Sequence, residues 1–178
     1  MGLRQQFNML ADAIGRLTAA VGRAAAWCIL FITLTQVAVV LLRYALGLGS
    51  IWLQESIIYG YAALFMLAAA WTLQADRHVR VDIFYAEAAP RRQALVNAFG
   101  TVVFLFPFCI VLLWFSLPYV ARSYAILERS RETSGLPLVF VLKSLIPLFA
   151  VLLALQGLAQ LIRSVLVLAD LRGDSAGR

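Results

Sequence analysis

The chain has 178 residues, of which 63% are hydrophobic by a broad count and only 13% are charged. Soluble domains carry about a quarter charged residues, and disordered chains combine low hydrophobicity with dense charge, so the composition excludes both classes. The net charge is +6, and 14 of the 15 basic residues are arginines that lie between apolar runs, not in a lysine-rich tract or along one helix face. This distribution indicates membrane topology and argues against nucleic-acid binding.

The N-terminal segment, residues 1–23, shows a helical pattern of its own. Apolar residues spaced alternately by four and three positions predict a helix over residues 3–21 with one apolar face. We expect this amphipathic helix to lie in the membrane interface in contact with lipids, although a cytoplasmic extension of the first span fits the same pattern. A cleaved signal peptide does not fit, because the apolar run that follows is too long. The apolar face consists of Leu3, Phe7, Leu10, Ile14, Leu17 and Val21.

Four apolar stretches are long enough to cross a bilayer, which takes about 20 helical residues. They cover about residues 24–43, 54–75, 91–121 and 137–166, and a polar tail follows over residues 169–178. The sequence therefore predicts an all-α integral membrane protein with a single four-helix domain over residues 24–168. Continuous apolar runs such as Val102 to Phe106 exclude a porin-like barrel, whose strands alternate polar and apolar residues.

The orientation follows from the arginines in the connections, since basic residues collect on the cytoplasmic side. Ten arginines fall on one side and four on the other, which predicts that both termini are cytoplasmic. The cytoplasmic set is Arg4, Arg16, Arg23, Arg77, Arg80, Arg91, Arg92, Arg163, Arg172 and Arg178, and the opposite set is Arg43, Arg122, Arg129 and Arg131.

Three charged residues lie at the outer margin of the predicted spans. Arg43 closes the first span and Glu55 opens the second, so the two flank one short hairpin and either form an ion pair or extend separately to water. Lys143 lies one to two turns inside the fourth span. Its partner is Glu128 or Glu132 of the preceding loop, or a group of another protein, unless its ammonium simply reaches water.

The inner connection, residues 76–92, is short and rich in charge. Asp82 is suited to cap a brief helix over residues 83–88, and Pro90 suits the first turn of the next span. His78 is the only histidine. We interpret it as a hydrogen-bonding surface residue, since a lone histidine rarely binds a metal.

Several kinds of chemistry lack the residues they need. One histidine cannot supply the paired axial ligands of a membrane haem, so no cofactor is expected. Cys28 and Cys109 differ in predicted depth by about 15–20 Å, which is beyond disulfide reach. No nucleotide-binding, zinc-protease or hydrolase motif is present, so an enzyme is not expected. The four spans do not repeat, and no carboxylate lies at mid-depth, so an accessory subunit is favoured over a complete transporter.

The order of the motifs resembles the small, DctQ-like membrane subunit of tripartite ATP-independent periplasmic (TRAP) transporters. The similarity covers about residues 24–163. The motifs that carry it are Arg43-Tyr44, Trp52-x-x-Glu55, His78-x-x-x-Asp82, Pro90, Ser134-Gly135-Leu136-Pro137, Leu142-Lys143 and Leu155-Gln156-Gly157.

This resemblance implies a bacterial inner-membrane symporter in which the chain has no catalytic role. A large, DctM-like membrane subunit would hold the substrate and sodium sites, and a periplasmic binding protein would deliver an organic acid. The small subunit would scaffold and anchor the large one. A self-sufficient homo-oligomeric exporter or channel remains the alternative, with Lys143 as its only interior charge.

Overall fold

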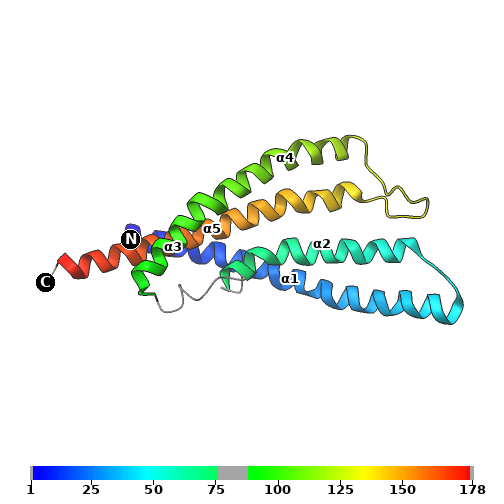
Figure 1. Cartoon of the computed structure of the whole chain (residues 1–178), viewed down its shortest axis with the longest axis horizontal. Helices are drawn as coiled ribbons and strands as arrows, with labels where there is room; N and C mark the ends of the chain where they lie inside the picture. The colour runs from blue at the N-terminus through cyan, green and yellow to red at the C-terminus, as the bar shows by residue number, and fades with distance from the viewer. Residues whose placement is uncertain (1, 76–87, 177–178) are drawn as a thin grey trace.

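The computed structural model describes residues 2–75 and 88–176, and every regular element among them is helical (Figure 1). Four helical segments are long and apolar enough to cross a membrane, which confirms the predicted all-α architecture. The rod formed by α3, η2 and α4 is one of these four segments. The elements are α1 (Leu3–Leu46), α2 (Ile51–Gln74), α3 (Pro90–Gly100), the π-helical η2 (Thr101–Leu105), α4 (Phe106–Ala125) and α5 (Val139–Ala176).

Helix α1 runs without interruption through 44 residues, a length of about 66 Å. The separate interfacial helix expected over residues 3–21 is therefore not formed, and this segment is instead an extension of the first span. Its pattern of apolar residues serves partly for packing, because Ala11 and Ile14 are buried against Ala159 of α5. Ion pairs on the same side join Arg4 to Asp170 and Asp12 to Arg163. Packing against α5 thus explains why the helix continues.

A tight connection of four residues joins α1 to α2. Gly47 adopts a left-handed conformation with φ of 66°, and the N–H of Leu48 donates to the carbonyl of Leu42 at 3.0 Å. Glycine reaches this conformation without the steric cost that a Cβ imposes. The Ser50 hydroxyl accepts a hydrogen bond of 3.4 Å from the N–H of Leu53, so α2 begins at Ile51, three residues before the predicted start.

The third span changes helical register in its interior. Pro90 is the first residue of α3, as predicted for a proline in the first turn of this span. Within η2, the N–H of Phe106 donates to the carbonyl of Thr101, one residue farther back than in an α-helix. Pro107 follows directly and has no N–H to donate to the carbonyl four residues earlier. The wider turn therefore lies where the regular series of α-helical hydrogen bonds would be interrupted. Gly157 of α5 faces this turn, where a Cβ would meet the side chain of Leu105.

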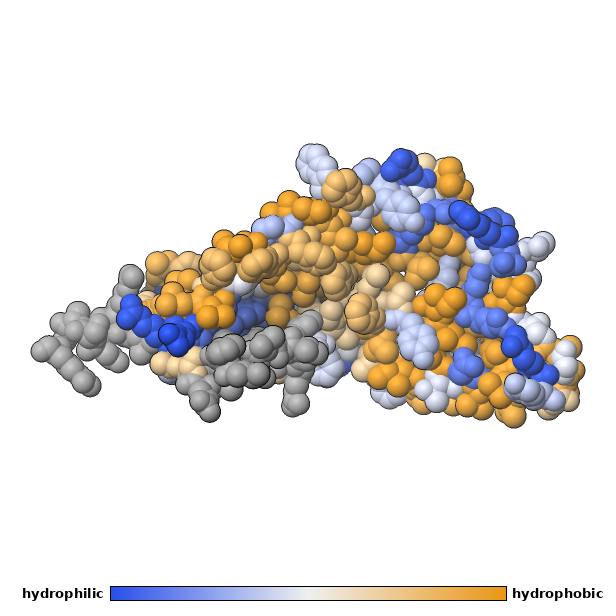
Figure 2. All heavy atoms as spheres, in the orientation of Figure 1, coloured by the Kyte–Doolittle hydropathy of each residue, from blue (hydrophilic) through white to orange (hydrophobic). Residues whose placement is uncertain are grey.

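Helix α5 holds the molecule together. It contacts α1, α2, α3 and α4, whereas α4 packs only against α5 and its own η2 segment among the described helices. The fold consists of two hairpins, α1–α2 and α4–α5, joined mainly along α5 (Figure 1). Trp114 and Phe115 on α4 are 73% and 69% exposed, in keeping with a surface that faces lipid or another membrane protein. Hydrophobic residues cover the middle of the molecule, and hydrophilic residues gather towards its ends (Figure 2).

Candidate functional site

The loop between α4 and α5, residues 126–138, is tied to α2 by the carboxylate of Glu55. One carboxylate oxygen accepts a hydrogen bond of 2.6 Å from the backbone N–H of Leu136, and the other accepts from the hydroxyl of Ser130. Gly135 lies against this contact, where a Cβ would come within 2.5 Å of the Ser130 Cβ and 2.8 Å of a Glu55 oxygen. The charged end of α2 and the folded loop therefore depend on each other.

Arg43, the other residue expected beside Glu55, takes no part in this contact. Arg43 is exposed in the last turn of α1, where its positive charge interacts favourably with the negative end of the helix dipole. No carboxylate of the described residues forms an ion pair with it. Of the two alternatives for Arg43 and Glu55, the ion pair is not formed. Glu55 contacts the loop instead, because the buried Leu136 supplies a backbone donor. Trp52, half exposed in the first turn of α2, presents its ring at the same end of the molecule.

Lys143 forms its ion pair within the chain. Its Nζ lies 2.5 Å from Oε2 of Glu128 and 4.0 Å from the centre of the Tyr119 ring, and the Ser123 hydroxyl donates to the same carboxylate oxygen at 2.7 Å. The Lys143 side chain is only 15% exposed. The hydrogen bonds from Lys143 and then Ser123 lower the pKa of Glu128 below its ordinary value. Of the partners considered for Lys143, the structure selects Glu128.

This ion pair lies beside a strained turn at the end of α4. Leu127 has φ of 45°, the only positive φ of a non-glycine residue in the described parts of the chain. The N–H of Leu127 donates to the carbonyl of Tyr124 at 3.1 Å, and the N–H of Glu128 donates to that of Ser123 at 3.0 Å. This pattern ends a helix in the manner usually reserved for glycine. The turn places the Glu128 carboxylate where it meets Lys143.

The remaining predicted site residues, His78 and Asp82, lie outside the described residues. Within residues 2–75 and 88–176, no three histidine, cysteine or acidic side chains are grouped as metal ligands. Cys28 and Cys109 are both free thiols, as expected from their separation along the spans.

At the opposite end of the molecule, a buried polar contact joins three helices. The hydroxyl of Thr18 on α1 lies 2.9 Å from the side-chain oxygen of Gln156 on α5 and 3.3 Å from that of Gln74 on α2. Thr18 is fully buried and Gln156 is 2% exposed. Sequence reasoning named Gln156 only within the motif Leu155-Gln156-Gly157 and missed its partner, since nothing local relates residues 138 positions apart.

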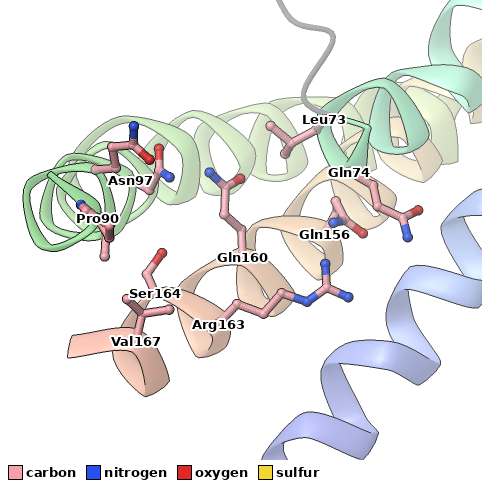
Figure 3. A pocket seen from close by; sticks show the side chains of 11 residues that line it. Leu73, Gln74, Pro90, Asn97, Gln156, Gln160, Arg163, Ser164 and Val167 are labelled. Carbon is pink, nitrogen blue, oxygen red and sulfur yellow. The ribbon is translucent and has the colours of Figure 1, made fainter. Parts of the chain in front are cut away.

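A polar cavity of about 320 Å³ opens beside this contact, between α2, α3 and α5 (Figure 3). Gln160 and Ser164 project from α5 towards the amide side chain of Asn97 on α3 (Figure 3). Its polar lining also includes Gln74, Gln93, Gln156 and Arg163. Amides and a hydroxyl can bind polar groups or water, but this lining has no arrangement of nucleophile, base and oxyanion donor.

The charged side chains of the described residues gather towards the two ends of the helices. No charged residue lies between Arg23 and Arg43 in α1, or between Lys143 and Arg163 in α5. Long apolar helices with charge at both ends define a multi-pass membrane protein.

A comparison with protein families identifies the family of membrane proteins to which the chain belongs. The model of the family described as Tripartite ATP-independent periplasmic transporters, DctQ component, matches residues 30–167, more than three quarters of the chain. The chain therefore belongs to the DctQ family, the small membrane subunits of TRAP transporters. This family is a transporter component and not an enzyme family. No curated protein and no solved structure matched the chain.

Proposed function

We propose that this chain anchors and scaffolds the large membrane subunit of a sodium-driven TRAP transporter that takes up an organic acid. Members of the DctQ family work with a DctM subunit and a binding protein, which supports these two partners for the chain. The distribution of charge carries the proposal. Because no charged side chain lies at mid-depth in the described helices, these helices offer no ionised group at mid-depth for coupling sodium or binding an acid there.

The packing of the helices supports a static role. Gly22 lies so close to α2 that a Cβ there would come within 2.5 Å of the Trp71 Cβ, and a Cβ at Gly60 would come within 2.8 Å of Ile32 of α1. Such contacts bring the α1 and α2 backbones close together, which favours one packing register for the hairpin. A rigid hairpin with exposed apolar faces suits a support for a larger membrane protein better than it suits a moving carrier.

We also propose an inner-membrane location with both termini in the cytoplasm. The end of the molecule that holds Arg16, Arg23, Arg91 and Arg163 would face the cytoplasm, as the rule for basic connections requires. The loop of residues 126–138 would then face the periplasm, on the side of the binding protein. Labelling of single cysteines placed at Gly2 and Glu132, with Cys28 and Cys109 replaced, tests this orientation. Labelling of Glu132→Cys from outside and of Gly2→Cys only after lysis supports it, and the reverse pattern contradicts it.

Reconstitution tests the function itself. The large subunit is placed in liposomes with its binding protein and a sodium gradient, with and without this chain, and uptake of a labelled organic acid is measured. We expect uptake only with both membrane subunits, while the affinity of the binding protein for the acid is unchanged. Full uptake by the large subunit alone would contradict the scaffold role. A stable homo-oligomer that conducts without the large subunit would instead support an independent exporter or channel.

A further inference from the structure

Arginines from two helices surround a cleft at the end of the molecule that holds the N-terminus. The cleft has a volume of about 340 Å³ and lies between α1, the last turn of α2 and α5. Gln74 and Arg163 line both this cleft and the polar cavity of Figure 3, so the two spaces adjoin. We call this joint space the basic cleft. Its α1 side carries Asp12, Gly15, Arg16, Ala19 and Arg23.

The charges of the described residues that line the basic cleft do not cancel. Arg163 lies 3.1 Å from Asp12, which is the only carboxylate among the described residues that line the cleft. Arg16 and Arg23 are exposed and form no ion pair with a described carboxylate. Three guanidinium groups thus face a single carboxylate, and the excess positive charge favours an anionic ligand.

The wall of the basic cleft is built to present hydrogen-bond donors. Gly15 has no side chain, and a Cβ there would come within 2.7 Å of the Gln74 amide nitrogen and 3.5 Å of a guanidinium nitrogen of Arg163. The missing side chain gives the Gln74 amide room at the α1 surface, beside the Arg163 guanidinium. A planar guanidinium beside amide donors matches the oxygens of a phosphate group.

The depth of the basic cleft suits a lipid headgroup. Arg23 is the last charged residue before the apolar run of α1, and Gln74 is the last residue of α2. The cleft therefore lies where the apolar part of the helices meets the charged end, which is the level of phospholipid phosphates. Basic pockets between membrane helices at this level are suited to anionic headgroups.

We infer that the basic cleft binds a phosphate group, supplied by an anionic phospholipid whose headgroup enters between Arg16, Arg23 and Arg163. The site goes beyond the transport role and does not depend on it, since it needs only this chain and the bilayer. A soluble phosphate is the other source of the same chemistry, and the experiment below separates the two.

The test uses the full-length chain in neutral detergent, with lipid occupancy measured by native mass spectrometry. The probes are phosphatidylglycerol, phosphatidylcholine with the same acyl chains, and inorganic phosphate. The variant Arg16→Gln/Arg23→Gln removes two charges from the basic cleft, and the matched control Arg129→Gln/Arg131→Gln removes two exposed arginines from the opposite end. Circular dichroism checks that both variants keep their helix content.

We expect the chain to retain phosphatidylglycerol in preference to phosphatidylcholine. Binding should weaken about fivefold for each arginine removed from the basic cleft and stay within about twofold in the control. Displacement of bound phosphatidylglycerol by millimolar phosphate would assign the site to a soluble anion, and resistance to it would assign the site to the lipid. Equal loss in both variants, or equal retention of both lipids, would overturn the inference.

Discussion

The carboxylate of Glu55 in α2 accepts a 2.6 Å hydrogen bond from the backbone N–H of Leu136, a residue 81 positions later in the chain. This contact joins the start of the second span to the loop between the third and fourth spans. A carboxylate of the first hairpin thus orders a loop that belongs to the second.

We expect Glu55→Ala to lower the free energy of unfolding by about 1–3 kcal/mol, because the buried Leu136 N–H loses its acceptor. The loop of residues 126–138 should also become open to proteases. Thermal unfolding in detergent and limited proteolysis measure the two effects. Glu132→Gln changes an exposed carboxylate in the same loop and should have little effect. Unchanged stability of the Glu55 variant would show that the loop folds without this acceptor.

The ion pair of Glu128 and Lys143 predicts a dependence of stability on pH. Because the pKa of Glu128 is lower in the folded state, its contribution is present above the pKa of an unfolded glutamate, about 4.3. The contribution is lost as the pH falls through the lowered value. Melting temperatures measured from pH 7 to pH 3 should therefore drop less steeply for Glu128→Gln than for the unmodified chain. Parallel curves for the two proteins would contradict this prediction.

A double-mutant cycle tests the same pair without a change of pH. We expect Glu128→Gln/Lys143→Met to be more stable than the sum of the two single effects predicts, because each single variant leaves one charge without its partner. Strict additivity of the unfolding free energies would show that the two charges act independently.

The strained turn at Leu127 predicts a stabilising substitution. A side chain in the left-handed region costs about 1–2 kcal/mol, and glycine avoids this cost. Leu127 is 61% exposed, so little packing is lost. We expect Leu127→Gly to raise the free energy of unfolding by about 0.5–1 kcal/mol after the greater freedom of the unfolded glycine is subtracted. Leu127→Ala keeps the steric cost and should not raise the free energy of unfolding. An increase as large as that of Leu127→Gly would contradict the explanation by backbone strain.

The buried contact of Thr18 with Gln156 predicts a loss of stability in Thr18→Val. Hydrogen bonds between membrane helices contribute about 0.6 kcal/mol on average and up to about 1.7 kcal/mol, and this pair is almost fully buried. The control is Thr33→Val, since the exposed Thr33 hydroxyl bonds only the carbonyl of Ile29 in its own helix. Unfolding in detergent should separate the variants, and equal losses would mean that the interhelical bond contributes nothing.

The four spans could be predicted because the length of an apolar run is a local property, and the bilayer fixes the length required. Pro90 was placed correctly for the same reason, since the preference of proline for a first helical turn is local. For Arg43 and Glu55, which flank one hairpin, the sequence left an ion pair and separate extension to water as alternatives. The carboxylate of Glu55 instead accepts hydrogen bonds from the loop of residues 126–138. The sequence around Glu55 gives no sign of this distant contact.

Long-range packing explains the other differences. The pattern of residues 3–21 is amphipathic, but an apolar stripe looks the same whether lipid or another helix covers it. Contact with Ala159 makes the segment part of α1. The contact between Thr18 and Gln156 could not be predicted without knowing which helices are neighbours. Polar residues in apolar spans signal such contacts, and only the fold supplies the second residue.

The central position of α5 also constrains the order in which the protein can be assembled during synthesis. Ribosomes release α1 and α2 first, and this hairpin can close as soon as both helices have entered the membrane, because its two helices pack directly on each other. Helix α4 has no such neighbour among the earlier described helices, and its place is settled only when α5 follows. The packing of the described helices is therefore completed only when α5 is made, and a nascent chain halted before α5 would leave its third span without a neighbour among the described helices.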